Sequence, residues 1–132
     1  MIRVSHMVIE KRGPKWQTVL GHSLLLASYT VFIFYISSQS FGELQLPEIW
    51  GIDKLIHIVE YGILGILWFR TIGAITGNLQ IAAAIAFVIT FIYGISDEVH
   101  QYFVPNRNSS IYDAIVDGLG ALLGIWLYRR RL

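Results

Sequence analysis

Four long apolar runs dominate the sequence of this 132-residue chain. They cover residues 19–36, 55–69, 79–95 and 111–128. A helix needs about 20 predominantly apolar residues to cross a bilayer, with about 17 as the lower end. Charged residues make up 14% of the chain, against about 25% in an average soluble domain. The sequence therefore predicts an integral membrane protein.

The runs are continuous, which predicts helices, because the strands of a membrane barrel alternate apolar and polar residues. The short connections between them are typical of antiparallel neighbours. We expect an all-α, integral membrane four-helix bundle. Its domain covers residues 19–128, between a basic tail at 1–18 and a basic end at 129–132.

The first run has a cleaved signal peptide as its alternative interpretation. A signal peptide has an apolar core of about 7–15 residues and ends in small residues. The run is longer than this, and Phe32, Phe34 and Tyr35 stand where the small residues would be. A membrane span is therefore favoured.

The basic residues predict the orientation. Eight of the ten lysines and arginines lie in the two tails and, as Arg70, in the second connection, while Lys54 and Arg107 border the first and third. Cytoplasmic loops carry the excess of Lys and Arg, so both termini are predicted to be cytoplasmic. We expect a multi-pass protein of the cytoplasmic membrane, with the first and third connections outside.

Composition also excludes some classes of partner and chemistry. Nucleic acid is excluded as a partner, because the net charge is +1 and the basic residues are scattered. The absence of cysteine excludes disulfides and thiolate metal sites.

Carboxylates collect on the predicted outer side. Asp53, His57, Glu60 and Tyr61 share one face of the second predicted helix at steps of four, three and one. A carboxylate within the membrane costs about 2.5 kcal/mol or more unless it is paired or hydrated, and it is a functional-site candidate by default. This face is predicted to turn inward.

The fourth predicted helix carries a similar stripe. Asp113, Asp117, Gly120 and Gly124 share one face at steps of four, three and four. The glycines form a small-xxx-small pattern that lets another helix backbone pack closely. Ser110 is a candidate N-cap, with Asn108 or Ser109 as alternatives. Pro105, in the preceding connection, breaks any helix.

Near the end of the third run, Asp97, His100 and Gln101 share a face with Tyr93 if the helix persists to that point. Glu98 would then point elsewhere. Whether the helix extends that far stays open at the level of sequence.

Two motifs in these stretches resemble the VanZ-like family of small bacterial membrane proteins. The first is Asp53-Lys54-x-x-His57-x-x-x-Tyr61-x-x-Leu64-Gly65, and the second is Asp97-Glu98-x-His100-Gln101-x-Phe103-x-Pro105-x-Arg107 followed by Asp113-x-x-x-Asp117-x-x-Gly120-x-x-x-Gly124. The resemblance implies a cell-envelope role linked to tolerance of the glycopeptide teicoplanin. It implies no particular reaction. The family pattern also accepts Asn at the position of Asp117, which favours hydrogen bonding there over a required charge.

The mixture of acid, base and cation suits acid–base chemistry or binding at one membrane face. The candidate catalytic residues are Asp53, His57, Glu98 and His100. The candidate ligand-binding residues are Lys54, Tyr61, Asp97, Gln101, Arg107, Asp113 and Asp117. The histidines and carboxylates would also suit zinc or manganese.

Structural roles are the alternative for every one of these residues. The histidines would then hydrogen-bond to carboxylates and fix helix packing. Asp113 and Asp117 would pair with Lys54 and Arg107. The segment 41–50 is either an interfacial lid or a plain loop.

Two functions follow. In the first, the protein acts on the polar headgroup of an envelope lipid or lipid-linked precursor. In the second, it is a non-catalytic binder of such a lipid or stabilises a partner membrane protein. A transporter is less favoured, because four spans without an inverted repeat offer little machinery for alternating access.

Overall fold

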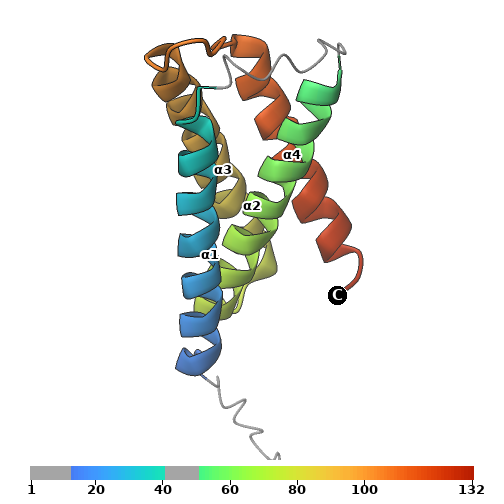
Figure 1. Cartoon of the computed structure of the whole chain (residues 1–132). Helices are drawn as coiled ribbons and strands as arrows, with labels where there is room; N and C mark the ends of the chain where they lie inside the picture. Colours follow the sequence, from blue (N-terminus) through green and yellow to red (C-terminus); the bar gives the residue numbers. More distant parts are fainter. Residues whose placement is uncertain (1–12, 41–50) are drawn as a thin grey trace, which may run out of the picture.

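A computed structural model describes residues 13–40 and 51–132. Four helices form an antiparallel bundle (Figure 1). They are α1 Trp16–Ser37, α2 Ile52–Thr76, α3 Leu79–Tyr102 and α4 Ile111–Arg129. Each is long and apolar enough to cross a membrane, and the described ranges contain no strand. The predicted all-α membrane bundle is confirmed.

The start of α1 and the end of α4 lie at the same end of the bundle (Figure 1). The predicted cytoplasmic location of both chain ends stays a prediction. The segment 41–50, interpreted as either a lid or a plain loop, and the tail residues 1–12 lie outside the described residues.

Helices α2 and α3 extend beyond the apolar runs that predicted them. α2 continues to Thr76, so Arg70, which was predicted to lie in the second connection, is inside the helix. Its guanidinium Nη2 lies 3.0 Å from Nε2 of His22 on α1. α3 continues to Tyr102. Polar residues interrupt the apolar run without ending the helix. Arg70 contacts His22 on α1, and Asp97 accepts a hydrogen bond from Gln101 on α3 itself.

Residues at the connections fix three helix ends. Gly77 ends α2 with φ 64°, a left-handed conformation that glycine adopts without steric cost. The Asn78 side chain then accepts from the backbone amides of Gln80 and Ile81 at the start of α3. At α4 the Ser110 hydroxyl accepts from the amide of Tyr112 at 3.2 Å, which confirms Ser110 as the cap.

α2 is the central helix, because its contacts with the other three are the most extensive in the bundle, above all those with α4. The predicted small residues make this contact possible. A Cβ added to Gly120 would lie 2.6 Å from the carbonyl oxygen of Ile58, and one added to Gly124 would meet the backbone of Gly62. The α2 and α4 backbones therefore touch, as the small-xxx-small pattern predicts.

Lipid-facing surface is largest on α1, which contacts α2 and α3 but not α4 within the described residues. Leu26 and Ile33 face the bundle and are buried, while Leu24, Val31 and Phe34 are exposed. This one-sided burial fits a helix that packs on the bundle along one stripe and meets acyl chains elsewhere.

Gly120→Ala should lower the thermal stability of the purified protein in detergent, by about 1–3 kcal/mol, because overpacking forces the backbones apart. Gly21→Ala on α1 is the matched control, since a Cβ there meets nothing within 4 Å. Melting curves of both variants make the comparison. Equal melting temperatures would contradict close α2–α4 contact.

Candidate functional site

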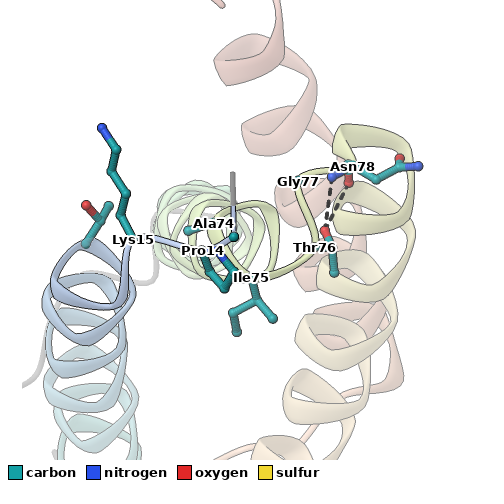
Figure 2. Close-up of a pocket in the computed structure, with 9 residues that line it drawn as sticks. Pro14, Lys15, Ala74, Ile75, Thr76, Gly77 and Asn78 are labelled. Atoms are coloured by element: carbon teal, nitrogen blue, oxygen red, sulfur yellow. Dashed lines mark hydrogen bonds between the residues drawn. The ribbon is translucent and has the colours of Figure 1, made fainter. Parts of the chain in front are cut away.

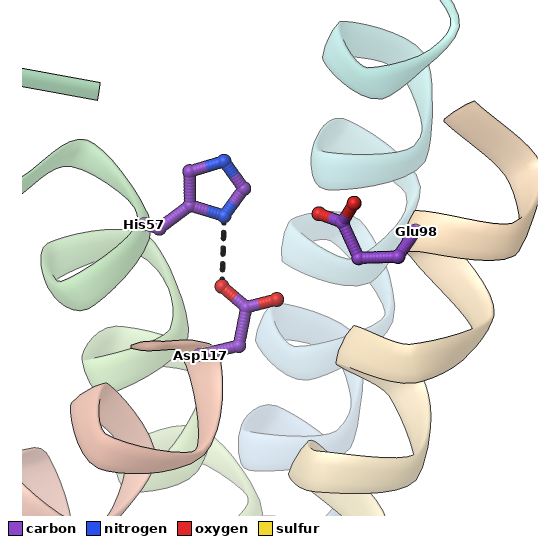
Figure 3. Close-up of side chains that lie close together, drawn as sticks. All are labelled: His57, Glu98 and Asp117. Atoms are coloured by element: carbon purple, nitrogen blue, oxygen red, sulfur yellow. Dashed lines mark hydrogen bonds and ion pairs between the residues drawn. The ribbon is translucent and has the colours of Figure 1, made fainter. Parts of the chain in front are cut away.

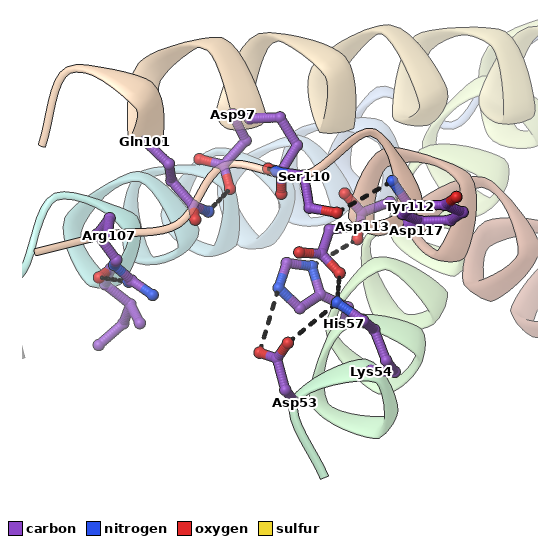
Figure 4. Close-up of polar contacts among 12 residues, drawn as sticks. Asp53, Lys54, His57, Asp97, Gln101, Arg107, Ser110, Tyr112, Asp113 and Asp117 are labelled. Atoms are coloured by element: carbon purple, nitrogen blue, oxygen red, sulfur yellow. Dashed lines mark hydrogen bonds and ion pairs between the residues drawn. The ribbon is translucent and has the colours of Figure 1, made fainter. Parts of the chain in front are cut away.

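Polar side chains gather at one end of the bundle, where α2 begins, α3 ends and α4 begins (Figure 4). We call six of them the polar cluster. They are Asp53, Lys54 and His57 from α2, Glu98 from α3, and Asp113 and Asp117 from α4. The two α2 and α4 faces identified from the sequence thus meet.

His57 and Asp117 form the buried centre of the polar cluster. Nδ1 of His57 lies 2.8 Å from Oδ1 of Asp117, whose side chain is 0% exposed. The ring of Tyr61, one turn along α2, stacks parallel to the imidazole. Asp117 Oδ2 is buried and has no hydrogen-bond partner among the described residues. The pair therefore joins α2 to α4 while leaving one carboxylate oxygen unsatisfied.

Glu98 enters this centre from α3 (Figure 3). Its Oε2 accepts a hydrogen bond from the backbone amide of Ser110 at 2.8 Å. Its Oε1 is buried without a hydrogen-bond partner in the described part of the chain. One ligand atom each from His57, Glu98 and Asp117 lies within 4.8 Å of the other two. The three side chains thus share one small volume.

Lys54 and Asp53 lie at the outer edge of the polar cluster. Lys54 Nζ forms an ion pair with buried Asp113 and contacts Asp53 Oδ2 at 3.1 Å. Asp53 is 66% exposed, and its other oxygen lies 4.0 Å from Nε2 of His57. The edge is therefore wet, in contrast to the buried centre.

Asp97 and Gln101 sit side by side on α3. The Gln101 amide donates to Asp97 Oδ2 at 2.8 Å, and both side chains are buried. Asp97 and Glu98 are adjacent in sequence, yet both are buried, because α3 has neighbours on two sides at this level. The sequence left open whether the helix extends this far. α3 continues to Tyr102, so Asp97 and Glu98 point in different directions.

His100 faces α1. Its Nε2 lies 3.0 Å from the Ser38 hydroxyl oxygen, and its ring packs on Phe34. Positions two apart on a helix point about 200° apart, so His100 and Glu98 project to opposite sides of α3. The Ser38 hydroxyl donates to the Phe34 carbonyl at 2.7 Å, which leaves His100 as the donor to Ser38. This geometry fastens α1 to α3 and does not activate Ser38 as a nucleophile.

Arg107 also serves α1. Its guanidinium donates to the backbone carbonyls of Ile36 at 2.7 Å and Gln39 at 3.1 Å. The last carbonyls of a helix have no partners inside the helix. Arg107 acts as a hydrogen-bond donor at this end of α1. The predicted ion pairs of Asp113 and Asp117 with Lys54 and Arg107 are thus half right: Asp113 binds Lys54, whereas Asp117 binds His57.

A family model described as VanZ/LLP1 matches residues 5–132. The chain belongs to the VanZ/LLP1 family. No curated protein and no solved structure matches it. The resemblance of the two sequence motifs to VanZ-like proteins is thereby confirmed over nearly the whole chain.

In this VanZ/LLP1 protein, the motif residues serve two different purposes. Those of α2 and α4, with Glu98, build the polar cluster, whereas His100 and Arg107 hold the end of α1. The predicted site residues therefore do not all converge on one point.

Gly94 was missed by sequence reasoning. A Cβ at this position would lie 2.9 Å from Oδ2 of Asp117 and 3.3 Å from the Tyr61 ring. Glycine therefore makes room for the Asp117 carboxylate against α3. A lone glycine inside an apolar helical run was the available signal, since such glycines often have a packing role.

Among the cavities that the described residues form, three flank the bundle. A groove of about 310 Å³ between α3 and α4 is apolar apart from Glu98 and Ser109, and another of about 470 Å³ between α1 and α2 includes Glu60. The largest, about 740 Å³, lies at the opposite end near Lys15 and Asn78 (Figure 2). Two lipid-facing grooves thus reach carboxylates, and the largest cavity does not touch the polar cluster.

Asp117→Asn should preserve most of the stability of the protein, because an amide oxygen can still accept from His57. Asp117→Ala should cost about 1–3 kcal/mol, since it leaves a buried polar group without a partner. Asp53→Ala, at the exposed edge, should change stability by less than about 0.5 kcal/mol. Thermal unfolding in detergent measures all three. If Asn is as damaging as Ala, a charge is required at residue 117.

Proposed function

We propose that this protein binds the polar headgroup of an envelope lipid, or of a lipid-linked cell-wall precursor, at the polar cluster. The cluster would face outward from the cytoplasmic membrane, and occupancy would underlie teicoplanin tolerance. The observation that supports this proposal is that Asp117 and Glu98 each have a buried oxygen with no hydrogen-bond partner among the described residues. Buried polar atoms in native structures are normally satisfied. The hydroxyls of Ser37, Tyr61 and Thr90 also lack a partner among the described residues, but Glu98 and Asp117 are carboxylates that share one small volume with His57, which supports a ligand there.

The place of the polar cluster favours a lipid over a soluble ligand. It lies at helix ends, beside the apolar groove between α3 and α4 that Glu98 borders. A lipid whose headgroup reaches Glu98 would lay an acyl chain along Ile95, Val99 and Ile115 in that groove. Most of a bound ligand's affinity comes from apolar contact, while a few polar groups fix its orientation.

The charged side chains of the polar cluster limit the chemical groups that the headgroup can carry. Ionised carboxylates only accept hydrogen bonds, so Glu98 and Asp117 suit hydroxyl or amine groups. Lys54 is the one lysine of the polar cluster, and it binds Asp113 and Asp53. An anionic oxygen of the headgroup would compete with these carboxylates for Lys54.

Acid–base chemistry on the headgroup is the second candidate function. His57 favours it, because Asp117 holds Nδ1 while Nε2 faces the wetter edge near Asp53. A carboxylate that orients an imidazole in this way prepares it for proton transfer. Glu98→Asp separates the candidates, since it should cripple a catalytic geometry and be partly tolerated by a binding site.

The functional test is teicoplanin tolerance in a sensitive bacterial host that expresses the protein. His57→Ala and Glu98→Gln should return the inhibitory concentration to that of the empty vector, because each removes a cluster side chain. His22→Ala is the matched control, since His22 contacts Arg70 away from the polar cluster. Immunoblots verify equal amounts in membranes.

Lipid extracted with purified wild-type protein and with Glu98→Gln, compared by mass spectrometry, tests binding itself. The proposal expects one headgroup class to be enriched with the wild type and lost with the variant. Unchanged tolerance in His57→Ala and Glu98→Gln, together with identical lipid profiles, would reject it.

Orientation has its own test, because the chain contains no cysteine. Asn108→Cys in the connection before α4 should react with a membrane-impermeant maleimide in intact cells. Arg131→Cys, just after α4, should react only after the cells are permeabilised. The opposite pattern would put the polar cluster at the cytoplasmic face.

A further inference from the structure

We propose that His57, Glu98 and Asp117 bind one divalent metal ion, zinc or manganese in class. The ligand atoms would be Nδ1 of His57, Oε1 of Glu98 and a carboxylate oxygen of Asp117. One atom from each side chain already lies within 4.8 Å of the other two. The inference rests on the proposed function only for the role of the ion, because the metal binds to the protein alone.

The positions of the three side chains support a metal site. Glu98 and Asp117 are 5% and 0% exposed, and each has one buried oxygen with no hydrogen-bond partner among the described residues. In Figure 3 the Glu98 carboxylate and the His57 ring face the space above Asp117. Two lone-pair donors that lack a proton donor, beside an imidazole, are the ligand types that zinc and manganese accept.

The charges of the buried carboxylates also support a metal ion. Three carboxylates, Glu98, Asp113 and Asp117, are buried together. Lys54 pairs with Asp113, and Asp117 pairs with the His57 imidazole, which is charged only if it is protonated. The charge of Glu98, and that of Asp117 beside a neutral imidazole, is left to be balanced. Removing uncompensated charges from water is costly, and a divalent cation would balance these two carboxylates.

Neighbouring residues lie behind two of the three ligands. The Ser110 amide holds Oε2 of Glu98 and leaves Oε1 pointing inward. Asp53 lies 4.0 Å from Nε2 of His57, the ring nitrogen on the far side from Asp117. Metal-binding histidines commonly direct their second ring nitrogen at a carboxylate. The three ligands thus come from three helices, and the Ser110 amide holds one of them, Glu98, from behind.

An ion here would also resolve a conflict within the proposed function. A cluster rich in carboxylates repels phosphate-bearing headgroups, whereas a metal with only three protein ligands keeps a position open for another oxygen. The ion would therefore direct specificity towards a phosphate or other anionic oxygen. His57 would then give its lone pair to the metal, so the metal role and the acid–base role are alternatives at this residue.

Metal binding is tested on full-length protein in detergent. Protein stripped with a chelator is titrated with zinc chloride and with manganese chloride by calorimetry, without added lipid. We expect one ion per chain for at least one of the two metals, and a cobalt(II) absorption spectrum that indicates nitrogen and oxygen ligands. Elemental analysis of protein purified without chelator checks which ion it carries.

The decisive variants are Glu98→Gln and His57→Ala, which each remove a ligand. Each should weaken binding by at least about 100-fold, because even residues behind a ligand are worth about 10–100-fold. Glu60→Gln is the matched control, since it removes a carboxylate from α2 outside the three ligands, and its affinity should stay within about threefold of the wild type.

The titrations and the lipid analysis together separate failure of the metal proposal from failure of the proposed function. Failure of wild-type protein to bind either metal below about 1 mM would overturn the metal proposal, as would equal affinities in Glu98→Gln and Glu60→Gln. If a variant fails to fold, the wild-type stoichiometry and the cobalt spectrum still decide. Lipid enrichment without metal binding would leave the proposed function standing and reject the ion alone.

Discussion

The contact of the α2 and α4 backbones at Gly120 and Gly124 is the constraint on which the site depends. Any larger side chain there would meet Ile58 or Gly62 and separate the helices. With the backbones in contact, Asp117 lies one turn before Gly120 on α4 and faces His57 across the crossing, at 2.8 Å. Close packing thus sets the distance between the two helices that carry most of the polar cluster.

The surrounding lipid explains why the polar residues are arranged in pairs. Water does not satisfy buried groups inside a bilayer, so each must find a partner within the protein. Lys54 with Asp113, Gln101 with Asp97 and Arg107 with the end of α1 all meet this need. Glu98 and Asp117 each keep a buried oxygen without a partner among the described residues, as do the hydroxyls of Ser37, Tyr61 and Thr90. Glu98 and Asp117 differ from these hydroxyls in being carboxylates that share one small volume with His57.

The sequence was sufficient for features that depend on local periodicity. Apolar length predicted four helices, helical spacing predicted the face of Asp117 and Gly120, and Ser110 was among the expected caps. It was insufficient where one residue chooses among partners on other helices. His100 turned to α1 and Arg107 to the α1 carbonyls, because the position of α1 beside α3 is a tertiary property that no spacing within the motif encodes. The family match over residues 5–132 confirmed the motifs, but it could not assign these contacts.

The most direct test of this account is a double-mutant cycle for unfolding, with His57→Ala, Asp117→Ala and the two combined. If the α2–α4 contact places these side chains together, the changes in unfolding free energy will deviate from additivity by about 0.5–3 kcal/mol, as for contacting residues. Additivity to within about 0.3 kcal/mol, the behaviour of distant sites, would show that they do not interact. The polar cluster would then lack its centre.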